Sequence, residues 1–321
     1  TASCGSVARR TPSTAEQHGS NGSCGGMSLH LQASDPLPGV RVQDSVQWAA
    51  IQQQMQGGVS LTPLLPIGDD AGVVWIPKNG CSTIKRAWLQ LQGCSEASHL
   101  VEPHAASLPH THWLNRDELH AVAPHRSLMA IWRDPIDRFV SACRSHLNEL
   151  TSSAIDAKLR NHSNGDEELY QQTAEFHDEL FASHGLASFS AEGDPVEVMN
   201  AVALQLPQWI QCHIDWSHHT LPQVAYLGGD PSVYFSLLGM EQITPLMQRW
   251  QQVSGVVLDA TPQHVSSELT NDDSWRCLQR DQLSPAALDA LQQFYAADWA
   301  FLELAQQRLG PMQTEPARQA A

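Results

Sequence analysis

A short apolar run that leads into a loop and then a helix occurs twice in this chain, and this order of elements constrains the fold most. The first unit starts with the apolar run from Val73 to Ile76, continues through the loop PKNGCST, and becomes a helix near Ser82. Apolar residues then recur at helical spacing, and Gly93 suits the C-terminal end of the helix. The pattern predicts a buried strand, a loop and a helix.

The second unit has the same order. The run from Leu128 to Trp132 is a predicted strand, Asp134 is a predicted N-cap, and Pro135 is the predicted first helical residue. The following residues form an apolar stripe with a period near 3.6: Ile136, Phe139, Val140, Cys143 and Leu147. Arg133 is therefore expected at the C-terminal end of a strand, and Ser141 about two turns into the helix.

The remaining elements complete an alternating pattern. We expect helices over 244–253 and from 284 towards 309, each started by Ser or Thr before Pro, and strands at 224–227 and 233–238. Strands that alternate with helices predict an α/β fold, here a P-loop NTPase-like three-layer fold with a mainly parallel central sheet flanked by helices. In such folds, ligands bind at the carboxyl ends of the strands.

The domain organisation follows from length and composition. A chain of 321 residues with 42% hydrophobic content can bury a large core. Residues 1–38 are rich in Ser, Gly and Pro without periodicity, so we expect a disordered tail there. A short Gln-rich helix is expected near 46–53. We predict a single domain over 39–310 and a flexible C-terminal tail over 311–321.

The charge of the chain restricts its partners. A formal net charge of -16 argues against non-specific binding of DNA, RNA or anionic lipid, because such binding needs a basic face. An anionic ligand therefore needs a local basic pocket. Eight of the 18 Lys and Arg residues fall between positions 78 and 144 and could supply one: Lys78, Lys85, Arg86, Arg116, Arg126, Arg133, Arg138 and Arg144.

The sequence shows no clear pattern of a membrane protein, a disulfide-rich protein or a zinc-binding protein. No apolar run reaches the roughly 18 residues of a membrane span, and the start shows no signal-peptide pattern. We expect a soluble, cytoplasmic protein, with a Golgi-lumen ectodomain as the alternative if an upstream anchor has been removed. Seven irregularly spaced cysteines do not predict a disulfide framework. The histidine-rich stretch at 212–219 matches no standard zinc spacing, and no metal is predicted.

The loop of the first unit has the chemistry of an anion site. A loop that enters a helix N-terminus offers free N–H groups and a partial positive charge. Gly80 lets the backbone approach an anion closely, Ser82 and Thr83 add hydroxyl donors, and Lys78 adds a point charge. The Walker pattern is absent, because the lysine precedes the turn instead of following a glycine-rich run.

These two segments together resemble those of a known family. IPKNGCSTIKRAW, at 76–88, is similar to the 5'-phosphosulfate loop of sulfotransferases, particularly the carbohydrate sulfotransferase branch. RDPIDRFVSACR, at 133–144, is similar to the 3'-phosphate motif of that family, in which an Arg after a strand is followed eight residues later by a Ser. The resemblance continues more weakly to about residue 304.

The resemblance implies an enzyme that transfers SO3 from 3'-phosphoadenosine 5'-phosphosulfate (PAPS) to an acceptor, without a metal. Lys78 is implied as a catalytic residue that contacts the phosphosulfate and stabilises negative charge on the leaving phosphate. Arg133 and Ser141 are implied at the 3'-phosphate. The loop residues implied to hold the phosphosulfate beside Lys78 are Asn79, Gly80, Cys81, Ser82 and Thr83.

A histidine is the implied base. In heparan sulfate 2-O-sulfotransferases, the second histidine of a His-x-His segment serves as base some twenty residues before the Arg-Asp-Pro motif. His110-Thr111-His112 lies at a similar distance from Arg133, so His112 is the predicted base, with His104 and His110 as alternatives. A small-molecule or glycan acceptor is expected, of neutral or modest charge. A P-loop kinase-like phosphotransferase and a non-catalytic nucleotide- or glycan-binding module remain alternatives.

Overall fold

The computed structural model describes residues 61–93, 103–190, 192–259 and 274–309. The predicted tails over 1–38 and 311–321 and the predicted helix at 46–53 lie outside these residues. Within them, none of the helices is both long enough and apolar enough to cross a lipid bilayer.

The centre of the fold is a five-stranded sheet with the order β3-β1-β2-β4-β5. Strand β2 pairs with β4, and β4 with β5, in parallel, whereas β1 is antiparallel to both β2 and β3. The sheet is therefore mixed, which corrects the prediction of a mainly parallel sheet. The strands are β1 (Thr62–Ile67), β2 (Ala71–Val74), β3 (His112–Leu114), β4 (Ser127–Trp132) and β5 (Ser236–Gly239).

The antiparallel half arises from a short connection. Ile67 pairs directly with Ala71, so only three residues join β1 to β2, and Gly68 at the start of that turn has a positive φ of 58°. A turn this short can only join antiparallel strands, since a parallel pair needs a long crossover.

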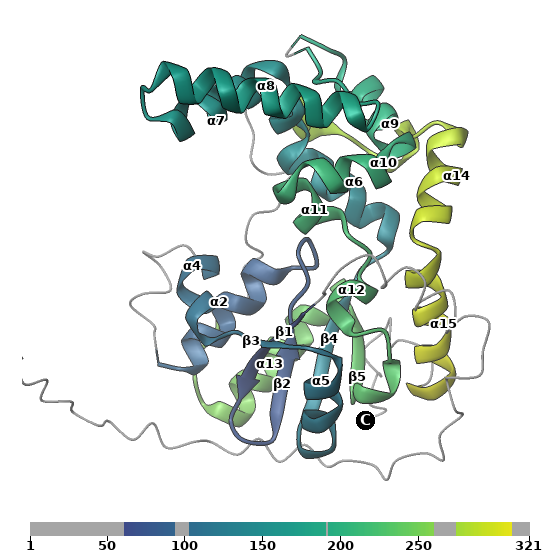
Figure 1. The fold of residues 1–321 in the computed structure, drawn as a ribbon. Coiled ribbons are helices and arrows are strands. Elements are labelled where there is room, and N and C mark those ends of the chain that lie inside the picture. The colour runs from purple at the N-terminus through teal and green to yellow at the C-terminus, as the bar shows by residue number, and fades with distance from the viewer. Residues whose placement is uncertain (1–60, 94–102, 191, 260–273, 310–321) are drawn as a thin grey trace, which may run out of the picture.

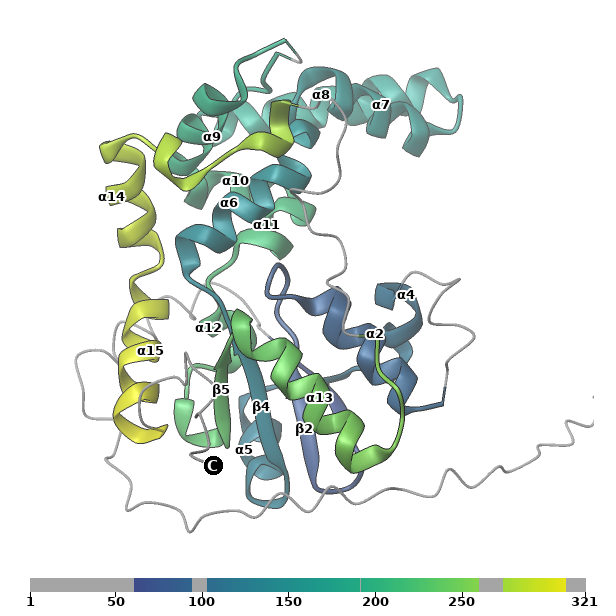
Figure 2. The same cartoon turned by 180° about the vertical axis from the view of Figure 1, so that it is seen from behind.

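Helices cover both faces of the sheet (Figures 1 and 2). The neighbours Val73 and Val74 belong to different hydrophobic cores, because successive side chains of a strand point to opposite faces. One face packs against α2 (Cys81–Leu91) and α13 (Ile243–Ser254). The other packs against α5 (Arg116–Val122), α12 (Val224–Leu227) and α15 (Ala296–Leu309). The predicted three-layer arrangement is therefore present around the sheet.

A second group of helices lies beyond the carboxyl ends of β2 and β4 (Figure 1). It has its own hydrophobic core, which includes Phe139, Trp209 and Trp216. The chain segments between the sheet and this group are those that carry the predicted site. The helices are α6 (Pro135–His146), α7 (Ser152–Ser163), α8 (Glu167–Ser183), α9 (Pro195–Leu204), α10 (Leu206–Cys212), α11 (Ile214–Thr220) and α14 (Pro285–Phe294).

Most predicted helices and strands are present, but the strand predicted over 73–76 is β2 at Ala71–Val74, and only the second half of the strand predicted over 233–238 is extended, as β5. Two further predictions are wrong. The run 224–227 forms α12, a single helical turn ended by Gly228 at φ 72°, and not a strand. A short apolar run of this length does not distinguish a strand from a buried helical turn. The predicted helix over 284–309 is two helices, separated at Tyr295, whose buried hydroxyl donates to the Thr220 carbonyl at 2.8 Å.

Candidate functional site

The loop between β2 and α2 has an unusual backbone. Lys78 is a non-glycine residue with φ 68°, and Gly80 has φ 69°. A Cβ atom on Gly80 would lie 2.5 Å from Cδ1 of Ile243, so a side chain there meets both a steric clash and an unfavourable conformation. A left-handed lysine is held against a local energy cost, as is common at functional sites.

Helix α2 starts without a side-chain cap. Its N-cap is Gly80, which has no side chain to accept a hydrogen bond from the first turn, and that turn holds no acidic residue. Helix α6 is the opposite case, since the Asp134 carboxylate accepts from the N–H groups of Ile136 and Asp137 at 2.9 and 3.1 Å. The N-terminus of α2 is therefore open to an external anion, whereas that of α6 is occupied by its own aspartate.

Two arginines of the second unit reach the loop of the first. Arg133 Nη1 donates to the Lys78 carbonyl at 2.8 Å, and Arg138 Nε donates to the Pro77 carbonyl at 2.8 Å. Arg138 is fully buried, and its Nη1 also donates to the Leu221 carbonyl at 2.6 Å. The two predicted anion-binding segments thus meet at one place, and Arg133 and Lys78 are direct neighbours.

A buried network of side-chain amides connects the same loop to β4. Asn79 Nδ2 donates to the Ile131 carbonyl at 2.7 Å and to Gln223 Oε1 at 2.6 Å. Gln223 Nε2 donates to the Arg133 carbonyl at 2.8 Å. Asp298 in turn accepts from the backbone N–H of Gln223 at 3.0 Å. The Asn79 side chain is therefore a structural tie between the loop and β4.

The site concentrates positive charge. The pKa of Lys78 falls from 10.5 to about 8, chiefly because of burial; Arg133 and Arg138 also lower it, whereas Cys81 and Glu149 raise it. Burial also lowers the pKa of Arg133. The carboxylate of Asp137 acts in the opposite direction, whereas the charges of Arg144 and Arg138 lower this pKa further. Neighbouring cations that destabilise one another are stabilised by a bound anion.

The guanidinium of Arg138 has a buried N–H donor group that lacks an acceptor among the described residues. Within the described residues, Arg138 Nη2 is buried and has no hydrogen-bond partner. Buried guanidinium donors without acceptors are costly, so the cluster gains from an anion with several oxygens. Together with the uncapped N-terminus of α2, the cluster has the chemistry of a site for an anion with several oxygens, such as a phosphate or sulfate group.

The other predicted loop residues lie at the start of α2. Ser82 and Thr83 are 8% and 6% exposed and belong to the first turn of the helix, next to the open N–H groups. Cys81 is a free thiol that packs in the core with Ile243, so its contribution to an anion comes from its backbone. Ser141 is buried in α6, and no hydrogen bond among the described residues joins it to Arg133.

The three candidate histidines occupy different places. His104 Nε2 lies 2.8 Å from Ser82 Oγ, so His104 reaches the loop. His110 packs its ring on Trp88, with centroids 5.4 Å apart, on the outer part of α2. His112 is exposed on β3, and because its neighbour Trp113 contacts Trp75 on the α2 face, strand alternation directs His112 to the other face. The structure brings His104, and not His112, to the loop.

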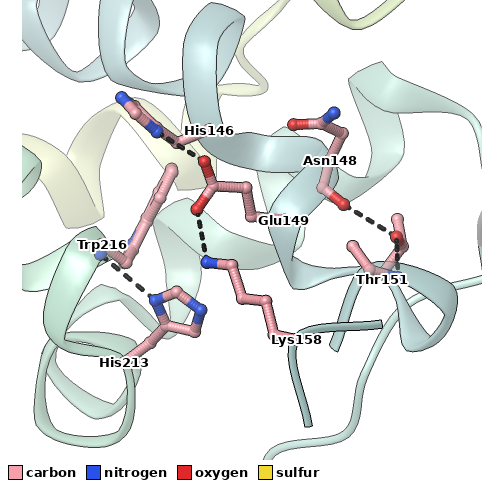
Figure 3. A network of polar contacts seen from close by, with 8 residues as sticks. His146, Asn148, Glu149, Thr151, Lys158, His213 and Trp216 are labelled. Carbon is pink, nitrogen blue, oxygen red and sulfur yellow. Dashed lines mark hydrogen bonds and ion pairs between the residues drawn. The ribbon is translucent and has the colours of Figure 1, made fainter. Parts of the chain in front are cut away.

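A second histidine group lies where α6 ends (Figure 3). His146 Nδ1 is 2.8 Å from Glu149 Oε1, and Lys158 Nζ is 2.9 Å from Glu149 Oε2. Burial by itself raises the pKa of Glu149, but these two hydrogen bonds outweigh it and lower the pKa to about 2. Since an ionised carboxylate only accepts, His146 Nδ1 carries the hydrogen, which leaves Nε2 as a proton acceptor in the neutral ring.

This histidine group continues to α11. The ring of His219 stacks on His146, with centroids 3.9 Å apart. Burial lowers the pKa of His219, and the charges of His146 and Lys78 lower it further. The stacked rings join the end of α6 to α11.

Several residues of the site escaped sequence reasoning. Gln223 and Asp298 lie in segments with no motif, and only their contacts identify them. Arg138 is one of the eight basic residues counted between positions 78 and 144, but it lies on the side of the helix opposite to the apolar stripe, so only its contacts identify it as a buried guanidinium.

Comparisons with known proteins give one family. Residues 72–304 match the model of the sulfotransferase family, a match that covers more than half of the chain and includes both strand–loop–helix units. The comparison with curated proteins gave no match, and neither did the comparison with solved structures. The chain therefore belongs to the sulfotransferase family, whose general activity is the transfer of a sulfuryl group.

Proposed function

We propose that this chain transfers the sulfuryl group of PAPS to a hydroxyl of a carbohydrate or small-molecule acceptor. The observation that carries the proposal is the 2.8 Å hydrogen bond from Arg133 to the Lys78 carbonyl, because it joins the two segments that resemble the 5'- and 3'-phosphate motifs. A single nucleotide can then contact both. Segments facing separate cavities could not serve one donor.

The open N-terminus of α2 is the proposed seat of the phosphosulfate. The backbone N–H groups of residues 80–83 and the hydroxyls of Ser82 and Thr83 donate to its oxygens in a P-loop-like manner. Arg133 and Ser141 hold the 3'-phosphate, the first through a planar guanidinium that suits two phosphate oxygens. PAPS supplies an already activated sulfuryl group, so alignment and charge stabilisation are the main tasks of the protein.

Lys78 is the proposed electrostatic catalyst. Its side chain is half-buried, the Arg133 guanidinium contacts its backbone carbonyl, and its pKa of about 8 keeps it largely protonated at neutral pH. Negative charge develops on the leaving phosphate oxygen in the transition state, and the Lys78 ammonium stabilises this charge. Because the interaction is strongest in the transition state, loss of Lys78 should lower turnover more than donor affinity.

The base that accepts the acceptor proton has two candidates. His112 follows from the resemblance to heparan sulfate 2-O-sulfotransferases, although its exposed side chain lies on the sheet face opposite to α2. His146 is favoured by its contact with Glu149, which fixes the ring tautomer, and by its stacking on His219 of α11. Sulfuryl transfer in His112→Ala and His146→Ala variants distinguishes them, since the base should be the one whose loss lowers turnover about 100-fold or more.

Binding of adenosine 3',5'-bisphosphate, measured by calorimetry, tests the donor assignment. We expect metal-independent binding that is lost in Arg133→Ala and largely kept in Lys78→Ala, which instead loses turnover. Arg126→Ala is the matched control, because Arg126 also donates to backbone carbonyls, those of Gly68 and Ala71, but at the opposite end of β2. Unchanged binding in Arg133→Ala would contradict the proposal.

Two rival functions predict different outcomes. A P-loop kinase-like phosphotransferase should bind ATP with Mg²⁺ in preference to the bisphosphate. A non-catalytic binding module should keep its ligand in every variant and turn over no PAPS with any acceptor. The net charge of -16 favours a neutral or modestly charged acceptor over a densely sulfated polymer.

A further inference from the structure

A three-residue chain of hydrogen bonds connects the start of α2 to a buried lysine. Ser82 Oγ lies 2.8 Å from His104 Nε2, and His104 Nδ1 lies 2.9 Å from Lys85 Nζ. Ser82 and Lys85 are three residues apart on α2, so they point to the same side of the helix. His104 comes from α4 (Pro103–Ser107), which lies alongside α2 (Figure 1).

The buried position of Lys85 requires an explanation. The residue is only 1% exposed, and its Nζ lies 3.3 Å from the ring centroid of Trp75. The face of the indole ring and the ring nitrogen of His104 both stabilise an ammonium group there. A cation is therefore held in the protein interior one helical turn from Ser82, a residue of the predicted phosphosulfate site.

Donor and acceptor roles fix the direction of every hydrogen bond in the chain. A lysine ammonium only donates, so His104 Nδ1 must accept. The neutral imidazole then carries its hydrogen on Nε2, which donates to Ser82 Oγ. Because the oxygen of Ser82 already accepts this bond, its own hydrogen is free to point towards the open N-terminus of α2. Each bond polarises the next one, which strengthens the hydroxyl as a donor.

We propose that His104 and Lys85 are positioning residues for the sulfuryl donor, and that they act by aiming the Ser82 hydroxyl at the 5'-phosphate group. This inference rests on the proposed function. His104 thus serves the donor side of the site and not the acceptor proton, although it is the histidine nearest to the loop. Lys85 fixes the tautomer of His104 and contributes a buried positive charge behind Ser82.

Two nucleotides that differ only at the 5' position isolate this role. Adenosine 3',5'-bisphosphate presents a 5'-phosphate to Ser82, whereas adenosine 3'-monophosphate does not. We expect His104→Phe and Lys85→Met to weaken binding of the bisphosphate about tenfold or more, as the loss of a hydrogen bond to a charged group does. Binding of the 3'-monophosphate should stay within about twofold, since it uses Arg133 and not Ser82.

A double-mutant cycle tests whether the effect passes through Ser82. His104→Phe should weaken bisphosphate binding in the wild-type background and have no further effect in the Ser82→Ala background. His104→Gln keeps a side-chain N–H in the place of Nε2 and should restore part of the affinity. Thermal unfolding of each variant shows whether it still folds. If His104→Phe does not fold, the bisphosphate affinity of His104→Gln is compared with that of the wild type instead.

The outcomes separate this inference from the proposed function. If the wild-type chain binds neither nucleotide, the proposed function fails. If the wild-type chain prefers the bisphosphate but His104→Phe weakens both nucleotides equally, or adds its full effect to Ser82→Ala, the proposed function stands and the positioning role is wrong.

Discussion

Replacement of Lys78 by methionine should stabilise the ligand-free chain while it abolishes sulfuryl transfer. The pKa of Lys78 falls from 10.5 to about 8, chiefly because of burial. A pKa difference of this size means that the charged lysine lowers the free energy of unfolding by at most about 3 kcal/mol. Methionine has nearly the same length, carries no charge, and leaves the backbone carbonyl that accepts from Arg133 in place.

The pH dependence of this effect follows from linkage. Below pH 8 the lysine is protonated in both the folded and the unfolded chain, so the folded state bears the full cost. Between pH 8 and 10.5 the unfolded chain binds more protons, and wild-type stability rises by about 1.4 kcal/mol per pH unit. The advantage of Lys78→Met should therefore be about 3 kcal/mol at pH 7 and about 2 kcal/mol at pH 9.

Urea unfolding of both proteins at the two pH values measures this advantage, and thermal unfolding should show a gain of roughly 2–4 °C per kcal/mol. Lys158→Met is the matched control, because it removes the same charge from an exposed lysine whose ion pair with Glu149 should contribute about 1 kcal/mol or less. The reasoning is refuted if Lys78→Met is no more stable than the wild type at pH 7, or if its advantage does not shrink at pH 9.

Three further substitutions probe the support of the site. Gly80→Ala places a Cβ 2.5 Å from Ile243 Cδ1 at a positive φ, so we expect a loss of about 1–3 kcal/mol in unfolding free energy together with weaker bisphosphate binding. Asp298→Ala removes the acceptor of two buried backbone N–H groups and should cost about 2–5 kcal/mol by urea unfolding. Asp134→Ala should lower the melting temperature through the loss of an N-cap that contributes about 1 kcal/mol, and it should leave α2 and its anion seat unchanged; a larger effect on bisphosphate binding than on stability would contradict this.

The sequence alone determined the local elements of the site. The apolar run before PKNGCST, the period of the following helix, and the Asp134-Pro135 start of α6 are properties of neighbouring residues, and the structure confirms the strands and helices they predict. Capping and helical periodicity act within one or two turns, so a linear sequence carries their signal in full. The membership of the family also followed from these segments.

Only the tertiary structure decided how these elements meet. The antiparallel β1, the contact of Arg133 with the Lys78 carbonyl, and the chain from Lys85 through His104 to Ser82 join residues that packing alone brings together. The same holds for the support of Asn79 by Gln223, which lies 144 residues away in sequence. Local sequence patterns determine where the chain is helical or extended. The packing of side chains against both faces of the sheet determines which polar groups share a site. This packing depends on contacts between residues that are distant in sequence, so no local pattern reveals it.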